Sequence, residues 1–260
     1  MALLSIDDFL KRDMDGYYLT QPLYSEITTA PGTLLGGMIG SLSKAGFTKA
    51  LPSTLPPSVT GYIVTTIEGS TDVRNSGTLL YGRIINLGSI DISGASGTFT
   101  DGDQMPTVTV GGNSLQLASA VICEVEVALN ATPGSLTITY VDQDGNTAET
   151  TTAQTLTASS PLGSCGFIVL NTGDWGVRDI TAATRSVGTT PTGTIRFWGV
   201  QPLGMGPTTA SGADGNCIIN SITTNLNIRP LPAGSNIAAF LHNANQAYGF
   251  QGSMYVIGDS

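Results

Sequence analysis

The sequence predicts an all-β protein, in which an antiparallel β-sandwich or jelly-roll body follows an irregular N-terminal arm. The first observation is that apolar and polar residues alternate in many short runs, such as SLTITYV at 135–141, and a period of two is that of a half-buried strand. The second is that Gly, Asp, Asn and Pro separate these runs, with no helical stretch between them. Strands at this spacing are typical of antiparallel sandwiches.

The N-terminal arm is predicted over residues 1–58. It opens with a short helix that carries Ile6, Phe9 and Leu10 on one face. The residues that follow are apolar and aromatic but have no clean period, so they are too irregular for a domain and too apolar for a disordered tail. We expect the arm to lie on the body or on a neighbouring subunit. Its candidate interface residues, chosen because large side chains give much contact area, are Phe9, Leu10, Tyr17, Tyr18 and Tyr24.

The main sandwich domain is predicted over residues 59–205. Its strands are expected at 61–67, 77–88, 107–112, 117–129, 135–141, 146–156, 165–170 and 192–200. Within one of these runs Cys123 alternates in step with Val121 and Val125. We therefore expect this cysteine to be a small buried residue and not a nucleophile.

The C-terminal segment, residues 206–260, is predicted to continue the pattern after a loose linker, GMGPTTASGADGN. Four more strands are expected at 216–222, 226–231, 235–242 and 252–258. The run AAFLHNANQA at 238–247 also fits one or two helical turns. These strands either form a small second domain or complete the sandwich.

The composition limits the class of protein and of ligand. Charged residues make up 11% of the chain and hydrophobic residues 40%, whereas about 25% charged residues is usual. Uncharged polar side chains or the surfaces of partner chains must therefore cover much of the protein. The formal net charge is −9, and the ten Lys and Arg residues are scattered. A phosphate backbone needs a basic patch, so nucleic acid is excluded as the main ligand.

Chain length and cysteine usage predict a fold without disulfides. A chain of 260 residues buries roughly 70% of its extended surface on folding, which suffices for a core. Cys123, Cys165 and Cys217 are far apart and form no CxxC pair, which favours a reducing compartment. We expect no secretion signal, because the N-terminus lacks a basic region and a long apolar region. We expect no membrane span, because no apolar run approaches about 18 residues.

The run DQDGN poses a choice between a calcium site and a turn. Asp142, Asp144 and Asn146 lie at alternate positions, and oxygen ligands at this spacing suit a hard cation. The glycine and glutamate positions of the helix-loop-helix calcium motif are not met, however, and the flanking runs indicate strands. Asp-Gly is also a common hairpin dipeptide. We predict a hairpin turn and no bound metal, with a looser calcium site that uses Glu149 as the alternative.

No catalytic residue and no cofactor are predicted. Nucleophilic catalysis by Ser or Cys needs a histidine base, and the single histidine, His242, has no GxSxG motif or cysteine beside it. Asp101 and Asp103 supply two acids as a glycosidase would, but acids two positions apart on a glycine turn diverge. The spacings of Cys, His and Lys fit neither a zinc site nor a phosphate-binding loop.

Several passages resemble one family. NTGDWGVRDI at 171–180, followed by TGTIRFWGVQPL at 192–203, is similar to a recurring passage in structural proteins of tailed-bacteriophage virions, a GDxGVR turn and then a strand that opens with TGT and ends in PL. SIDISGASGTFTDGDQMP, GSLTITYVDQDGNTAET and the closing VIGD have the same character. The resemblance covers about 60–205. It implies an all-β, capsid-associated or minor structural protein without cofactors and without catalytic residues.

The GDWGVR passage is expected to form a well-packed corner. Its two glycines allow a tight turn, and Trp175 is expected to pack beneath it. Arg178 is expected to pair with an aspartate, either Asp174 or Asp179.

Three functions follow from these observations. The first is a capsid-bound decoration or minor capsid protein that is assembled in the host cytoplasm and located in the virion, with the major capsid protein or other virion proteins as partners and a homo-oligomer, most simply a trimer, as its state. The second is a host-facing adhesin or carbohydrate-binding module at a tail or fibre. The third is a virion-associated hydrolase. Neither nucleic acid nor a membrane is an expected partner.

Overall fold

A computed structural model gives the fold of the protein. It describes residues 18–27, 34–35, 42–55, 61–71, 77–93, 96–105, 109–110, 113–114, 118–130, 134–186, 192–211, 214–220, 231–242 and 248–259. Within these ranges the chain forms strands, turns and bends, all strand pairs are antiparallel, and there is no helix. It follows that the described residues offer no helix of the length and apolarity needed to cross a bilayer.

The strands have the following bounds. They are β1 (Tyr18–Ile27), β2 (Leu42–Ala50), β3 (Gly61–Thr71), β4 (Gly77–Asp91), β5 (Thr98–Asp101), β6 (Thr109–Val110), β7 (Asn113–Ser114), β8 (Ala120–Val127), β9 (Ser135–Asp142), β10 (Glu149–Thr150), β11 (Gln154–Thr155), β12 (Ser164–Phe167), β13 (Val177–Ser186), β14 (Thr194–Ser211), β15 (Asp214–Asn220), β16 (Asn236–His242) and β17 (Tyr248–Asp259).

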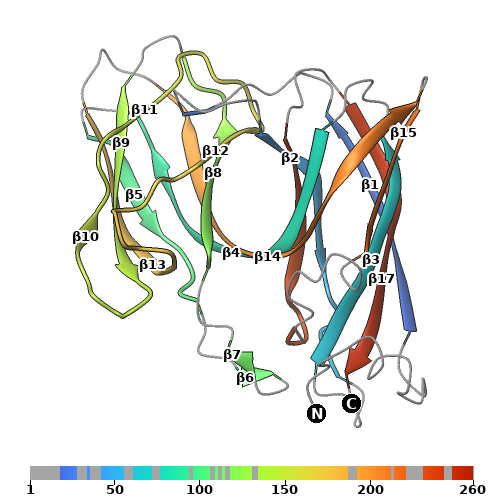
Figure 1. The fold of residues 1–260 in the computed structure, drawn as a ribbon. Coiled ribbons are helices and arrows are strands. Elements are labelled where there is room, and N and C mark those ends of the chain that lie inside the picture. The colour runs from blue at the N-terminus through green and yellow to red at the C-terminus, as the bar shows by residue number, and fades with distance from the viewer. Residues whose placement is uncertain are drawn as a thin grey trace.

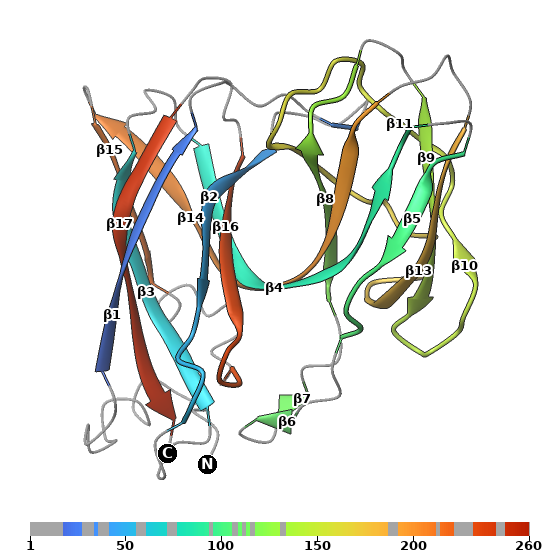
Figure 2. The ribbon, with the colours of Figure 1, turned by 180° about the vertical axis from the view of Figure 1, so that it is seen from behind.

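Strands β4 and β14 organise the molecule. They pair along almost their whole length, from Thr194↔Asp91 to Thr208↔Gly77, and run side by side through the middle of the fold in Figures 1 and 2. The remaining order, β14-β8-β12-β2-β16-β4, returns to β4. These strands therefore close into a ring, which we call the central ring. Beyond it, the C-terminal end of β14 carries the order β15-β3-β17-β1.

A β-sandwich forms on the other side of β4 and β14. A second sheet, in which β9 pairs with β10, β11 and β13, lies over β4, β5, β8 and β14 (Figure 1). Along β9 the buried and half-buried residues alternate at every position, as the pleat of a half-buried strand requires. The predicted antiparallel sandwich is therefore confirmed.

Two hydrophobic cores share the same strands. Successive side chains of a strand point to opposite faces, so Ile122 of β8 packs inside the central ring, with Val200 and Phe240. Its neighbours Val121 and Cys123 pack into the sandwich core. A strand that is buried on both faces has apolar residues at consecutive positions. Val121, Ile122 and Cys123 of β8 form such a run.

A β-bulge at Leu87 keeps β4 in both cores. Phe197 is opposite Gly88 while Trp198 is opposite Asn86, so Leu87 is the extra residue. An extra residue reverses the alternation of faces. Ile84 consequently packs inside the central ring, whereas both Leu87 and Ile90 pack into the sandwich core.

The structure differs from the sequence expectation within residues 1–58. The expected arm has no regular period, yet it contains β1 and β2, which pair with β17 and with β12 and β16. The partners of both strands come from distant parts of the chain, so no local window shows them. The expected helix around Phe9 lies outside the described residues. The domain boundaries at 58 and 205 stay predictions, although β14 runs through residue 205 without a break.

Other differences concern single elements. The expected linker after residue 204 is the end of β14, which forms a hairpin with β15 through Ser211↔Asp214. Three further described strands, β5, β7 and β13, were not expected. Residues 236–242 form β16 and not a helix, because they pair with β2 on one side and β4 on the other.

Candidate binding slot beside strand β4

The candidate site lies where β4 changes its partner on one edge. β16 pairs with β4 up to Asn236↔Ile84, and β5 pairs with it from Asp101↔Gly88 onward. On this edge the residues between them, 85–87, have no partner strand within the described ranges. A break in the sheet results, and it opens onto a cavity of about 490 Å³. We call this cavity the slot.

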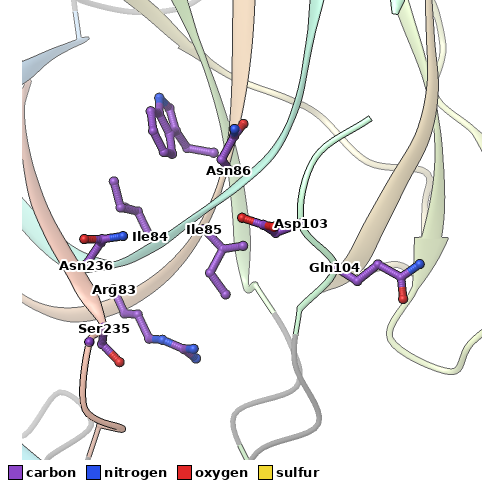
Figure 3. Close-up of a pocket in the computed structure, with 10 residues that line it drawn as sticks. Arg83, Ile84, Ile85, Asn86, Asp103, Gln104, Ser235 and Asn236 are labelled. Atoms are coloured by element: carbon purple, nitrogen blue, oxygen red, sulfur yellow. The ribbon is translucent and has the colours of Figure 1, made fainter. Parts of the chain in front are cut away.

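Three segments and one tryptophan line the slot. The segments are residues 83–86 of β4, residues 103–104 after β5 and residues 234–236 at the start of β16, and the tryptophan is Trp198 of β14. Figure 3 shows the side chain of Arg83 extended between Ser235 and Ile85, while the Asp103 carboxylate lies beside Ile85.

Backbone contacts hold the wall formed by the end of β5 against the bulge. The N–H of Asp103 donates to the carbonyl of Asn86 at 2.7 Å, and the N–H of Gly88 donates to the Asn86 side-chain oxygen at 3.1 Å. Gly88 has a φ of +124°, which glycine adopts without steric cost. A Cβ on Gly102 would lie 2.2 Å from the Gly88 nitrogen. Only glycine allows this approach.

Arg83 is the charged residue of the slot. It is 6% exposed, and its Nη1 donates to the side-chain oxygen of Gln201 at 3.1 Å. The Nε group is buried and has no hydrogen-bond partner among the described residues. Burial lowers the pKa of the guanidinium, because removal from water disfavours the charged form. An arginine still remains protonated at neutral pH, so the slot holds a buried positive charge.

The other polar side chains of the slot are partly engaged. Ser235 donates its hydroxyl to the carbonyl of Pro232 at 2.7 Å, and the Trp198 indole N–H donates to Glu124 at 2.7 Å. Gln104 points away from the other labelled residues in Figure 3, and its amide hydrogen-bonds Asp179. Asn236 and Asp103 are exposed. The slot therefore presents amide, hydroxyl and carboxylate groups around one guanidinium.

The turn between β9 and β10 is a second polar site. Asp142 accepts the N–H groups of Asp144 and Asn146, each at 2.8 Å, and the Asn146 side-chain amide at 2.7 Å. Burial alone would raise the pKa of Asp142, but these donors lower it below its usual value. β9 ends at Asp142, β10 pairs back onto it through Glu149↔Tyr140, and Gly145 has a φ of +88°. The predicted hairpin turn is confirmed.

The GDWGVR corner is built differently from the expectation. Trp175 is 61% exposed and does not pack beneath the turn. Arg178 donates to the carbonyl of Gln143 at 2.6 Å and not to an aspartate. The expectation failed because the β9–β10 turn, which sequence spacing does not place here, supplies the acceptor. Asp174 instead accepts the hydroxyl of Tyr140, and burial raises the pKa of this tyrosine to about 12.

The sequence-predicted site residues are placed as follows. Phe9, Leu10 and Tyr17 lie outside the described residues. Tyr18 and Tyr24 lie in β1, at the edge of the large sheet, opposite Ile257 and Gln251 of β17. The structure describes no side-chain contact for either tyrosine, so their role at an interface stays a prediction.

The residues weighed for catalysis are also placed. Cys123 is fully buried, as predicted, and burial raises its pKa to about 12, which keeps it a thiol. His242 lies in β16, opposite Leu42 and Thr78. Asp101 ends β5 and accepts the N–H of Gly102 at 3.0 Å. Asp103 lines the slot.

Comparisons with known proteins give distant structural matches. No family model matches the chain, and no curated protein does. Among solved structures, the VP2 subviral particle of infectious bursal disease virus matches with 9% identity over 94% of this chain and 81% of that chain, at a TM-score of 0.20. The Gx and Gt strain structures of that virus match with 9% identity each over 94% and 96% of this chain and 80% and 81% of theirs, at TM-scores of 0.20 and 0.21. TM-scores of this size do not establish a common arrangement of strands. The function is therefore inferred from this chain's own residues.

Sequence reasoning missed the slot. Arg83 stands in the predicted strand GTLLYGRIINLG as its one charged residue, and a lone charge within an apolar strand is a signal that was available. The remaining lining comes from three separate segments, and no spacing along the chain brings them together.

Proposed function

We propose that this chain is a non-enzymatic virion structural protein that acts through protein–protein assembly, as a capsid-bound decoration or minor capsid protein. The major capsid protein or other virion proteins are its partners. The observation that carries the proposal is the exposed Trp175 on a surface poor in charge. The chain is 11% charged and 40% hydrophobic, and aromatic residues such as tryptophan are enriched at protein–protein interfaces.

Trp175 has the properties of an interface anchor. Its side chain is 61% exposed, yet its backbone is held, because the N–H groups of Trp175 and Gly176 both donate to the side-chain oxygen of Gln143, at 3.1 and 3.3 Å. Gln143 itself is 8% exposed. Tryptophan is among the residues that dominate binding energy at interfaces, and a side chain presented by an ordered turn loses little entropy on binding.

A second apolar surface supports the same proposal. Val127 and Leu162 are 56% and 59% exposed. The N–H of Gly163 donates to the carbonyl of Val125 at 2.9 Å, so Leu162 lies next to the end of β8 that carries Val127. Two separate apolar surfaces suit a subunit with more than one neighbour, as in a homo-oligomer, most simply a trimer, that also binds a shell.

The proposal is tested by oligomeric state and by location. We expect the full chain to form an oligomer in light scattering coupled to gel filtration, with interfaces above about 1,000 Å² per pair. Trp175→Ser should lower the oligomer fraction while the melting temperature stays unchanged, because an exposed side chain contributes little to folding. Thr152→Ser, at an exposed position outside this corner, is the matched control and should change neither.

Particle analysis then decides between the candidate functions. Virus particles that encode this chain should be purified on a density gradient, and they should contain it in many copies. Mild dissociation should release these copies together with the shell. A few copies that leave with the tail would favour the adhesin instead. A monomer at all concentrations, absent from purified particles, would contradict the proposal.

A further inference from the structure

The slot beside β4 is separate from the two apolar surfaces proposed for assembly, and it contains a charge that needs a partner. In the described part of the chain, Arg83 has one hydrogen bond, from Nη1 to Gln201, and its Nε is buried with none. No carboxylate among the described residues forms an ion pair with it, and burial lowers its pKa. Asp103 lines the same slot but forms no ion pair with it.

A buried guanidinium without a counter-charge is costly to the fold. Removal of a charge from water costs several kcal/mol unless pairing and hydrogen bonds compensate it. The group that compensates an arginine best is a carboxylate, because two oxygens match the planar fork of N–H donors. Arg83 lines the slot, so a carboxylate in the slot would accept from the N–H donors of its guanidinium fork.

The other walls of the slot suit a molecule with several hydroxyl groups. The side-chain oxygen of Asn86 accepts from Gly88, which leaves its NH₂ group as a donor. The Ser235 hydroxyl donates to Pro232, so its oxygen can accept. Asn236 adds an exposed amide, and Trp198 adds an aromatic side chain. Amides, hydroxyls and an aromatic ring around a concave site are the groups that orient small polar ligands.

Size and charge narrow the ligand further. The cavity of about 490 Å³ falls in the range of about 300–1,000 Å³ that small-molecule sites occupy. The formal net charge of −9 and the Asp103 carboxylate at the slot oppose a polyanion, since like charges reduce both encounter and affinity. One guanidinium therefore matches a ligand with one carboxylate.

We propose that the slot beside β4 binds a carboxylated sugar of the uronic or sialic acid class, with its carboxylate on the guanidinium of Arg83 and its hydroxyl groups on Asn86, Ser235 and Asn236. This site does not depend on the assembly function, since Trp175, Val127 and Leu162 are not among the residues that line it.

The first experiment is a titration of the full-length protein followed by NMR. The probes are D-glucuronate, D-galacturonate and N-acetylneuraminate, with D-glucose, D-galactose and acetate as references. At least one acidic sugar should shift the Trp198 indole resonance and bind about tenfold or more tightly than every reference, because charged hydrogen bonds of this kind are worth about 1.5–3 kcal/mol. Acetate binding as tight as that of the acidic sugars would overturn the sugar assignment.

Two substitutions test the role of Arg83, one that removes a positive charge from the slot and one that removes a negative charge. Arg83→Gln should weaken binding of the acidic sugar about tenfold or more, while Asp103→Asn should strengthen it, because an exposed like charge leaves the slot. Arg178→Gln removes a guanidinium at the β9–β10 turn, outside the slot, and should leave the affinity unchanged. Thermal melting separates lost binding from lost folding, since removal of the unpaired buried charge in Arg83→Gln should not lower the melting temperature.

Three results would overturn the proposal. They are the absence of any acidic-sugar binding at millimolar concentration to the folded wild type, equal affinity in wild type and Arg83→Gln, and no acidic sugar that binds more tightly than the neutral sugars.

Discussion

Two of the buried charged side chains of this protein have very different surroundings. Asp142, at the β9–β10 turn, is 2% exposed and accepts three hydrogen bonds from Asp144 and Asn146. Arg83, in the slot, is 6% exposed and has one described hydrogen bond, to Gln201, and an unpartnered Nε. The two side chains are buried to a similar extent, but Asp142 has more hydrogen-bond partners than Arg83.

The difference separates a structural role from a binding role. A buried polar group that has all its partners stabilises one conformation, because no other arrangement satisfies it. A buried charge that lacks partners destabilises the fold, and such strain is retained typically where it serves a site. Asp142 therefore stabilises a turn, whereas Arg83 is the residue that we propose binds the carboxylate of a ligand. Four predictions test this contrast, from the largest expected effect to the smallest.

Gly102→Ala should be the most destabilising of these changes, by about 3 kcal/mol. The new Cβ would lie 2.2 Å from the Gly88 nitrogen and 2.5 Å from the Asn86 oxygen, and backbone atoms cannot move aside as side chains do. The free energy of unfolding in urea measures the loss. Gly163→Ala is the control, because Gly163 has a φ of +81° but no atoms within 4 Å. It should cost about 1 kcal/mol. Equal losses would show that the close approach beside the slot is not needed.

Asp142→Ala should lower the melting temperature and reduce the acid sensitivity of the fold. The donors of Asp144 and Asn146 lose their acceptor, and the pKa of Asp142 is lowered in the folded state. The unfolded chain then binds more protons, so this residue stabilises the fold above the unfolded pKa and the effect disappears as the pH falls through the folded pKa. Thermal melting from acidic to neutral pH measures it, with the exposed Asp144→Ala as control. A wild-type-like pH profile in Asp142→Ala would refute the role of the turn.

Arg83→Met should leave the protein as stable as the wild type, or more stable by up to about 2 kcal/mol, because an apolar side chain of similar volume replaces an unpaired buried charge. The matched control is Arg178→Met, which removes the 2.6 Å hydrogen bond to Gln143 and should destabilise by about 1 kcal/mol. Changes of opposite sign in the free energy of unfolding in urea would support the difference between the slot and the turn. A large loss in Arg83→Met would mean that Arg83 is a structural residue after all.

Asp179→Asn should give the smallest effect, a gain below about 1 kcal/mol at neutral pH. Burial and the nearby Asp101 raise the pKa of Asp179, and its Oδ1 has no partner in the described part of the chain. A raised pKa of an acid means that the folded state binds more protons, so stability falls as the pH rises from the unfolded pKa through the folded one. The variant should remove this fall, which melting curves at acidic and neutral pH would detect. A variant less stable than the wild type at neutral pH would contradict it.

Local patterns predicted the elements that pair with near neighbours or alternate strictly. The β9 run predicted its strand, and DQDGN predicted the turn, because both depend on residues that are close in sequence. Cys123 was predicted to be buried from its alternation with valines. A pleated strand with one buried face leaves this pattern in any window of the chain.

The sequence by itself determined the all-β class, the antiparallel character and most strands of the sandwich, because period and turn chemistry are local properties. Tertiary structure alone decided the rest. β1 and β2 are strands because β17 and β16 reach them from the other end of the chain, and the slot exists because β4 exchanges β16 for β5 across residues 85–87. Trp175 is exposed, and Arg178 donates a hydrogen bond to the carbonyl of Gln143, because the β9–β10 turn lies beside the GDWGVR corner. These features depend on hydrogen bonds between segments that are far apart in sequence, and such segments come together only when the chain folds.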